Sequence, residues 1–400
     1  MMSTGEEFPF ERYDQRLSVP FEYPVYFTRD VFKPGNPLLE SVCDRLGEGR
    51  RHRTAVYVDA GLVEAQPALP ERIKEYFHAR PARLELACPP ALVPGGEAAK
   101  TGWDVVRDVM WTIGNLHLDR QSYVLAVGGG GVLDMVGFAA SIVHRGLRLI
   151  RVPSTTLAQA DAGVGVKNGM DEHGMKNFVG TFAPPFAVLN DFALLGSLAD
   201  RDWRGGLAEA LKVAVIKDAD FFEFLAAHAQ RLRDRDQALM EQAVRRAAVI
   251  HLDHIRGGGD PFEFGSARPL DFGHWVGHKL ETLSGLTLGH GQAAAIGIAV
   301  DCHVAAERGL LTPEQLERIL HAIEGCGLPT WSDLLDRRTA DGELEVLAGL
   351  EEFREHLGGA LTITLPDGIG ARREVHHVDA GAVARAVDSL RRRARAGGAA

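Results

Sequence analysis

The sequence predicts an α/β domain in the first half of the chain and an all-α domain in the second half. Short apolar runs alternate with helix-like stretches up to about residue 205, as in a mainly parallel sheet covered by helices. From residue 206 onward, amphipathic helical patterns dominate. The length of 400 residues suits two domains, which we place at residues 1–205 and 206–400.

The expected strands of the first half are short and apolar. The run at 54–59 (TAVYVD) ends in an acid, and the run at 122–127 (SYVLAV) leads directly into four glycines. A helix-like stretch at 132–143 follows these glycines, as expected for a strand-to-helix unit. The full set of expected strands is 54–59, 83–87, 122–127, 147–152 and 186–189.

The second half is expected to consist of helices joined by loops. The sequence RGG at 204–206 marks the expected domain boundary, and GGGDP at 257–261 is typical of a loop. The last ten residues, RRRARAGGAA, are expected to fray. The expected helices are 207–217, 221–233, 237–255, 273–283, 292–307 and 313–325.

Composition excludes several classes of protein. The formal net charge is −10 and the calculated pI is about 5.9, which argues against a nucleic-acid partner bound through a broad positive field. The chain has no apolar run long enough to cross a membrane, and its acidic start does not resemble a secretion signal. The four cysteines form no CxxC pair, so we expect reduced thiols in a cytoplasmic protein.

Glycine is enriched, with 45 residues in the chain, and four of them follow an expected strand at 128–131. A glycine turn before a helix lets the backbone and free N–H groups approach a phosphate. The pattern is neither GxGxxG nor a P-loop, so a tight turn without a ligand remains an alternative. Asp59 ends an earlier strand, where a carboxylate receives ribose hydroxyls or caps a helix.

Six of the 16 histidines lie between residues 251 and 303. His274 and His278 are four residues apart and share a face of the expected helix, and His290 follows in a Gly-His-Gly sequence. Two or three imidazoles with a carboxylate such as Glu209 would bind zinc or another divalent ion. A solvated or buried histidine pair without metal is the alternative.

Two lysines lie among small residues, in DAGVGVKN at 161–168 and in GMKN at 174–177. An ammonium group binds phosphate oxygens, although a surface lysine without a ligand is the simpler interpretation of each one alone. A nucleotide loop, a histidine cluster and these cations together indicate redox chemistry on a phosphorylated polyol.

The sequence resembles the sugar phosphate cyclases of the dehydroquinate synthase superfamily. The matching segments, in the order found in that family, are VPGGEAAK, GGGGVLDMVGF, HRG, VPSTTLAQADAGVGVK, GMKNFVGTF, GLAEALK, FGHWVGHKLE and GHG. The resemblance implies an α/β nucleotide-binding domain, an all-α metal-binding domain and an active site between them. It also implies NAD, one zinc or cobalt ion, a small sugar phosphate substrate and a homodimer.

The resemblance assigns roles residue by residue. The implied metal ligands are Glu209, His274 and His290. The implied NAD-binding residues are Asp59, Glu97, Lys100, Gly129, Gly130, Asp134, Ser154, Thr155, Asp161, Lys176 and Ser197. The implied catalytic and substrate-contacting residues are Arg145, Asp161, Lys167, Asn177, Lys212, Arg268, Asp271 and His278.

The chemistry implied by the resemblance has four stages. Bound NAD⁺ takes a hydride from a ring carbinol, phosphate is eliminated, the hydride returns, and the opened chain closes by an intramolecular aldol reaction. NAD is unchanged overall, and the phosphate itself is a candidate base.

Departures from dehydroquinate synthase indicate the branch that converts sedoheptulose 7-phosphate to 2-epi-5-epi-valiolone in secondary metabolism. Residues 165–168 read GVKN where dehydroquinate synthase has GGKT, and Asp271 replaces an asparagine. An added carboxylate would repel an anionic substrate group at that position. His251 stands at a lysine position, and Arg268 is one residue out of register.

The loop before Asp271 is longer than in dehydroquinate synthase, and Arg354 or His356 takes the place of paired lysines near the C-terminus. The alternatives to the valiolone-forming reaction are 3-dehydroquinate synthase, a metal-dependent polyol dehydrogenase and a non-catalytic binding relative. The lysine-bearing loops argue against a dehydrogenase, because a neutral polyol needs no phosphate site.

Overall fold

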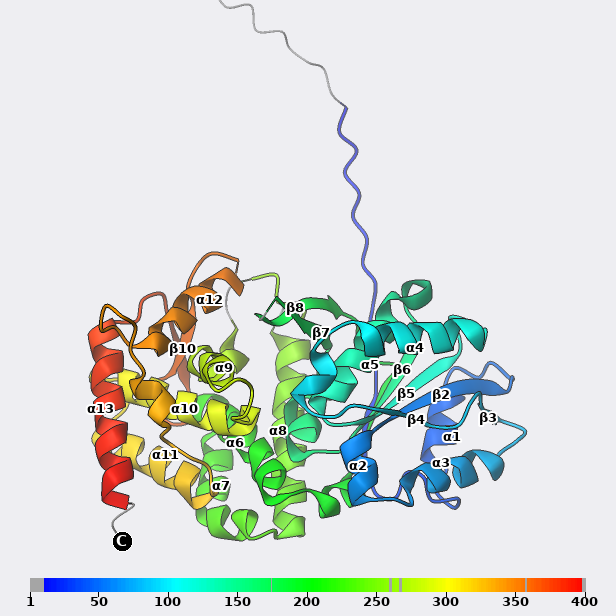
Figure 1. The fold of residues 1–400 in the computed structure, drawn as a ribbon, viewed down its shortest axis with the longest axis horizontal. Helices are drawn as coiled ribbons and strands as arrows, with labels where there is room; N and C mark the ends of the chain where they lie inside the picture. The colour runs from blue at the N-terminus through cyan, green and yellow to red at the C-terminus, as the bar shows by residue number, and fades with distance from the viewer. Residues whose placement is uncertain (1–10, 174, 259–260, 266–267, 357, 398–400) are drawn as a thin grey trace, which may run out of the picture.

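The computed structural model describes residues 11–173, 175–258, 261–265, 268–356 and 358–397. A sheet with flanking helices forms one end of the molecule, and a group of helices forms the other (Figure 1). This arrangement confirms the predicted α/β half followed by a helical half. Among the described residues, no helix combines the length and apolar character that crossing a bilayer requires.

The main sheet is parallel and has the strand order β1-β9-β6-β5-β2-β3, with β4 also pairing with β2. Its strands are β1 (Val25–Thr28), β2 (His52–Asp59), β3 (Leu84–Leu86), β4 (Ala91–Val93), β5 (Tyr123–Gly128), β6 (Arg148–Pro153) and β9 (Ala187–Asp191). All five expected strands are present. Strands β1 and β4, which are only four and three residues long, were not predicted.

Helices cover both faces of this sheet because alternate strand residues point to opposite sides. Val56 and Leu125 belong to the apolar layer under α1 and α3, whereas Tyr57 and Ala126 belong to the layer under α4 and α5. The helices of this half are α1 (Leu38–Cys43), α2 (Ala60–Ala65), α3 (Leu69–His78), α4 (Asp104–Asn115) and α5 (Gly130–Ile142).

The carboxyl ends of three central strands lie side by side. The register pairs Val58 with Val127 and Gly128 with Pro153, so β2, β5 and β6 end at the same edge. Ligands of parallel α/β sheets bind at this kind of edge. The loops after Asp59 and Gly128 are therefore placed where the sequence analysis expected a nucleotide.

A two-stranded antiparallel hairpin, β7 (Lys167–Glu172) and β8 (Met175–Phe182), packs beside α5 and was not expected. Its sequence contains glycines and charged residues instead of an apolar run, so its strand structure depends on tertiary contacts. The side chain of Asn168 fits against Gly137 of α5, where a Cβ atom would clash with it.

The second half is built around α6 and α10, whose residues are mostly buried. Its helices are α6 (Asp200–Lys217), α7 (Ala219–Arg233), α8 (Gln237–Gly257), α9 (His274–Leu283), α10 (His290–Glu307), α11 (Pro313–Gly325), α12 (Ala348–His356) and α13 (Ala380–Gly397). It also contains an antiparallel hairpin, β10 (Ile363–Pro366) and β11 (Arg372–Val375), so it is helical without being purely α.

Two segments that were expected to interrupt regular structure are helical. The RGG sequence at 204–206 lies inside the continuous helix α6. A Cβ at Gly206 would lie 2.5 Å from the Thr156 carbonyl carbon, so this glycine permits close packing and does not form a turn. The C-terminal tail is helical to residue 397, and Arg393 of α13 pairs with Glu317 and Glu324. The domain division at 205/206 remains a prediction.

Candidate active site

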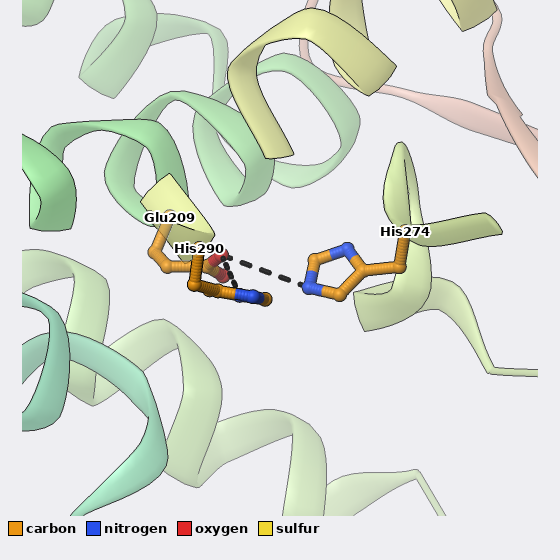
Figure 2. A group of neighbouring side chains, drawn as sticks. All are labelled: Glu209, His274 and His290. Atoms are coloured by element: carbon orange, nitrogen blue, oxygen red, sulfur yellow. Dashed lines mark ion pairs between the residues drawn. The ribbon is translucent and has the colours of Figure 1, made fainter. Parts of the chain in front are cut away.

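The candidate metal centre joins one carboxylate and two imidazoles from three helices (Figure 2). Glu209 lies in the middle of α6, and His274 and His290 are the first residues of α9 and α10. Glu209 Oε1 lies 3.7 Å from His274 Nε2 and 3.4 Å from His290 Nε2. The three residues predicted as ligands therefore form one cluster, in which Glu209 is only 1% exposed.

Further contacts orient both imidazoles towards Glu209. His274 Nδ1 lies 3.0 Å from the carbonyl oxygen of Phe272, and His290 Nδ1 lies 3.3 Å from Glu281 Oε1. Such contacts are typical of metal-binding histidines, because they fix the ring and leave Nε2 for the ion. The buried Glu209 carboxylate lies beside both Nε2 atoms and also pairs with Lys212. This donor set fits a divalent ion such as zinc or cobalt.

The predicted ligand set omits Glu281, a buried carboxylate of α9 beside the centre. Glu281 lies seven residues after His274 and three after His278, so the three side chains share a helix face. His278, Glu281 and His290 form a second group of neighbouring possible ligands. The i, i+4, i+7 spacing in HWVGHKLE was the available signal for Glu281.

The electrostatics of the centre favour neutral nitrogen donors at two histidines. Burial and the nearby charge of Lys212 lower the pKa of His274, and burial and His274 hold the pKa of His278 well below its usual range. Burial acts in the same direction on His290, but Glu281 and Glu209 outweigh it and raise its pKa to about 10. Glu281 and Glu209 thus favour positive charge at the position of His290.

A chain of buried ion pairs connects this centre to the sheet half. Lys212 lies one turn after Glu209 on α6, pairs with it, and has its Nζ 3.5 Å from Asp161 Oδ2. Asp161 lies in the π-helical turn η3 (Ala158–Ala162) and also pairs with His251 of α8. Burial opposes the charge of Lys212, but Asp161 and Glu209 outweigh it and raise the pKa of Lys212.

Asp271 is an ionised carboxylate beside the predicted phosphate-binding cations. It ends the 3₁₀ turn η5 (Pro269–Asp271), three residues before His274. Burial alone would raise its pKa, but Lys167, His274, Lys212 and Arg268 lower it to about 2. Asp271 is also the position at which an asparagine was expected, and its surroundings place a negative charge among these cations.

The glycine loop and Asp59 meet at the carboxyl edge of the sheet. A Cβ at Gly128 would lie 3.0 Å from the Cβ of Asp59, so only glycine permits this approach. Gly61 N–H donates to Asp59 Oδ1 at 2.9 Å, which is the helix-capping alternative. Asp59 Oδ2 lies 3.5 Å from the nitrogen of Gly129 and faces the loop. Gly130 then starts α5, whose free N–H groups fit a phosphate.

Lysines predicted to bind NAD make ion pairs near this loop. Lys100 Nζ lies 2.9 Å from Asp134 Oδ2 of α5 and also contacts the side-chain oxygen of Asn177. Lys176 Nζ lies 2.8 Å from Glu281 Oε1 and 3.3 Å from Glu97 Oε2. The β7–β8 hairpin, which carries Asn177 and Lys176, therefore lies between the glycine loop and the metal centre.

The remaining residues predicted to bind NAD follow the carboxyl ends of β6 and β9. Ser154 is buried directly after β6, and Thr155 Oγ1 accepts a hydrogen bond from the Ala158 N–H at 3.0 Å. Ser197 ends the turn η4 (Phe192–Ser197), and its hydroxyl accepts a 2.8 Å hydrogen bond from Gln66 Nε2.

Arg145 and Arg354 were considered for the substrate site, and the structure gives them other surroundings. Arg145 is exposed and lies three residues before Arg148, at the sheet edge opposite Gly128, so one chain does not bring it to the metal centre. Arg354 of α12 pairs with Glu351 on the same helix at 2.8 Å. The side chain of His356 lies outside the described part of the structure.

Family models described as the two parts of 3-dehydroquinate synthase match the two halves of this chain. Residues 90–205 match a family model described as 3-dehydroquinate synthase N-terminal, and residues 206–347 match one described as 3-dehydroquinate synthase C-terminal. A 2-epi-5-epi-valiolone synthase of Streptomyces glaucescens is 36% identical over 94% of this chain and 92% of its own. A 3-dehydroquinate synthase of Geotalea uraniireducens is 30% identical over 86% and 93%.

The fold of this chain is also similar to that of a solved structure. It is the 2-epi-5-epi-valiolone synthase ValA of Streptomyces hygroscopicus subsp. jinggangensis, described with NAD⁺ and Zn²⁺ bound. Its TM-score is 0.83 and its sequence identity 28%, over 95% of this chain and 100% of that chain. The likeness therefore extends over both halves of the fold.

Proposed function

The chain belongs to the dehydroquinate synthase superfamily, and we propose that it is a sugar phosphate cyclase of the valiolone-forming type. It converts a seven-carbon ketose phosphate, sedoheptulose 7-phosphate, to a carbocycle such as 2-epi-5-epi-valiolone and releases phosphate, which makes it a lyase. The 36% identity to a 2-epi-5-epi-valiolone synthase over nearly the whole chain supports this reaction.

The observation that carries the choice of substrate is the ionised Asp271. Lys167 and Arg268 act on its carboxylate and help to keep its pKa at about 2. A substrate carboxylate placed beside Asp271 would be repelled, whereas a hydroxyl group would be a hydrogen-bond donor to it. This favours an uncharged ketose end over the acid of 3-deoxy-arabino-heptulosonate 7-phosphate, the dehydroquinate synthase substrate.

We propose NAD and one zinc or cobalt ion as the cofactors, because ValA has NAD⁺ and Zn²⁺ bound. Asp59, the glycine loop and the start of α5 would hold the dinucleotide, and Glu209, His274 and His290 would hold the ion. When bound, NAD⁺ accepts and returns a hydride, and the ion polarises the oxygen of the reacting carbon.

The remaining site residues bind the substrate and hold protons. Lys167 and Arg268 supply positive charge for the phosphate. Lys212 fixes the Glu209 carboxylate through a buried ion pair. His278 has its ring centroid 5.3 Å from that of His274, and its lowered pKa keeps the imidazole neutral, with a ring nitrogen available to accept a hydrogen bond from the substrate.

The test is to incubate the pure protein with NAD⁺ and Zn²⁺ or Co²⁺, separately with each heptulose phosphate, and to measure inorganic phosphate. We expect phosphate from sedoheptulose 7-phosphate, with a carbocyclic product identified by NMR. Phosphate from 3-deoxy-arabino-heptulosonate 7-phosphate alone would instead identify a 3-dehydroquinate synthase. A steady absorbance rise at 340 nm without phosphate release would identify a polyol dehydrogenase.

We also propose a cytoplasmic homodimer without nucleic-acid partners. The described cysteines are free and three of them are buried, which suits a reducing compartment. Tyr13 and Leu17 of the extended N-terminal segment and Phe178 of β8 are largely exposed apolar side chains, which suits an interface with a second copy. Light scattering coupled to gel filtration tests the oligomeric state.

A further inference from the structure

The predicted phosphate site contains a carboxylate that the proposed function does not use. Glu263 lies in the segment between α8 and η5, and its Oε1 is 2.7 Å from Lys167 Nζ. Its Oε2 is 3.6 Å from Arg268 Nε. One carboxylate thus bridges the two cations, as two oxygens of a phosphate group would.

We propose that Glu263 is an internal counter-ion that occupies the phosphate position between Lys167 and Arg268, and that the substrate phosphate displaces it. This inference rests on the proposed function, because it takes these two cations as the phosphate site. It assigns Glu263 a role in setting phosphate affinity, because every phosphate ligand must displace the Glu263 carboxylate.

The exposure of the partners shows that this ion pair is accessible to a ligand. The Lys167 side chain is 52% exposed and the Glu263 side chain 24% exposed. Water screens a pair of this kind, so its net contribution to stability is small and a dianion can replace it. The Lys212–Glu209 pair is almost fully buried and offers no comparable exchange.

Arg268 keeps an unused donor at this position. Its Nε is buried and makes no hydrogen bond, because the 3.6 Å contact to Glu263 is too long for one. Its Nη2 donates to the backbone carbonyl oxygen of Glu263 at 3.4 Å. Glu263 itself has a φ of +53°, a conformation that side-chain-bearing residues rarely adopt. The carboxylate is therefore held in place without satisfying Arg268, whereas a phosphate oxygen closer to Nε would do so.

The charges around the proposed phosphate position also indicate that Glu263 competes with the substrate phosphate. Glu263 and Asp271 place two carboxylates beside Lys167 and Arg268, so a phosphate group that enters between these cations meets two like charges. Removal of the Glu263 carboxylate removes one of these two repulsive charges. A dianion then binds against less electrostatic repulsion.

The test measures the affinity of inorganic phosphate by calorimetry on the NAD- and Zn²⁺-loaded protein at low salt, without turnover. We expect E263Q and E263A to bind phosphate on the order of tenfold more tightly than the wild type, because a repulsive charge is removed. E223Q is the matched control, since Glu223 of α7 pairs with Arg318 on the surface at 2.6 Å. It should leave phosphate affinity unchanged.

A double variant separates charge removal from a general change of shape. In the K167A background, E263Q should give a much smaller gain, because one of the two cations that Glu263 neutralises is missing. Unchanged or weaker phosphate binding by both E263Q and E263A would overturn the inference. If tighter phosphate binding were found in a protein that releases no phosphate from sedoheptulose 7-phosphate, the proposed function would fail while the counter-ion role would stand.

Discussion

The carboxylate of Glu281 lies 2.8 Å from the ammonium group of Lys176 and 3.3 Å from His290 Nδ1. Lys176 belongs to the β7–β8 hairpin of the sheet half, whereas Glu281 and His290 belong to the helical half. A single buried carboxylate thus links a residue predicted to bind NAD with a predicted metal ligand. We therefore expect Glu281 to be a positioning residue for both.

Glu281→Gln should lower zinc affinity. The amide removes the charge that holds the His290 ring, and loss of such a supporting contact typically weakens metal binding by about 10- to 100-fold. Chelator competition followed by metal analysis measures this change. E307Q is a matched control, because Glu307 of α10 pairs with Arg385 at the surface. Equal zinc affinity in E281Q and the wild type would contradict the positioning role.

The same substitution should weaken NAD binding through Lys176, which would lose an ion pair and retain its contact with Glu97. The dissociation constant of NAD⁺, measured by fluorescence in metal-free protein, separates this effect from metal loss. We expect a rise of about two- to tenfold, as for a changed pairing in a coupled ion-pair network. A change in zinc affinity alone would confine the role of Glu281 to the metal centre.

Local motifs in the sequence predicted much of the candidate site. Gly128 to Gly130 follow a strand and start a helix, and His274 and His278 follow helical spacing, so short stretches of sequence were sufficient. His290 and Glu209 were named as candidates from the sequence pattern, and the family resemblance then assigned them as ligands. The contact between Lys176 and Glu281 could not be predicted in this way, because it joins residues 105 positions apart through the packing of a hairpin on a helix.

Local sequence patterns were likewise insufficient to predict the parts of the fold that depend on tertiary contacts. The central strands and the long helices α6, α7, α8, α10 and α11 were predicted because apolar periodicity specifies them, whereas the 18-residue helix α13 was not predicted. The β7–β8 hairpin was missed because its polar strands depend on α5 for burial. The glycines at 205 and 206 were assigned to a boundary, although Gly206 permits helix α6 to pack against Thr156. A glycine required for close packing has the same sequence signal as a glycine required for a turn.

Arg151→Met should destabilise the protein. This fully buried residue of β6 donates from Nη1 to the carbonyl oxygens of Gly163 and Gly165, and from Nη2 to the Lys167 carbonyl oxygen and Asn168 Oδ1, at 2.6–3.2 Å. Loss of this donor leaves buried acceptors unpaired, so we expect the free energy of unfolding to fall by about 3 kcal/mol.

Urea denaturation measures this change in stability. R107M is the control, because Arg107 is exposed and its contact with Asp104 is a 3.4 Å surface pair. We expect the control to change the free energy of unfolding by less than about 0.5 kcal/mol. Similar losses in the two variants would show that the four hydrogen bonds of Arg151 contribute little.

Asp301 should make stability depend on pH. Burial raises its pKa to about 7, although it accepts hydrogen bonds from Trp275 Nε1 and the Gly273 N–H. Between about pH 4 and 7 the folded state keeps this proton and the unfolded state loses it, so the contribution to stability falls as pH rises and is constant above 7. Three pKa units at about 1.36 kcal/mol each give a total of about 4 kcal/mol.

D301N removes this titration, so the wild type should lose stability relative to D301N from pH 4 to 7. Denaturant midpoints measured at intervals of one pH unit on both proteins give the difference. Because both proteins share every other titrating group, the difference isolates Asp301. A difference that stays constant over this range would mean that Asp301 is already ionised at pH 4 in the folded protein.

Asp271→Asn should reduce discrimination between the two heptulose phosphates. The ionised carboxylate repels an acidic substrate group, and an amide of the same shape does not. We expect the ratio of kcat/KM for 3-deoxy-arabino-heptulosonate 7-phosphate to that for sedoheptulose 7-phosphate to rise about tenfold, because specificity depends on the repulsive element as well as on attraction. D253N serves as the control, since Asp253 forms an exposed pair with Arg256. If the ratio in D271N equals that in D253N, the charge of Asp271 does not select the substrate, and its role is limited to balancing Lys167 and Arg268.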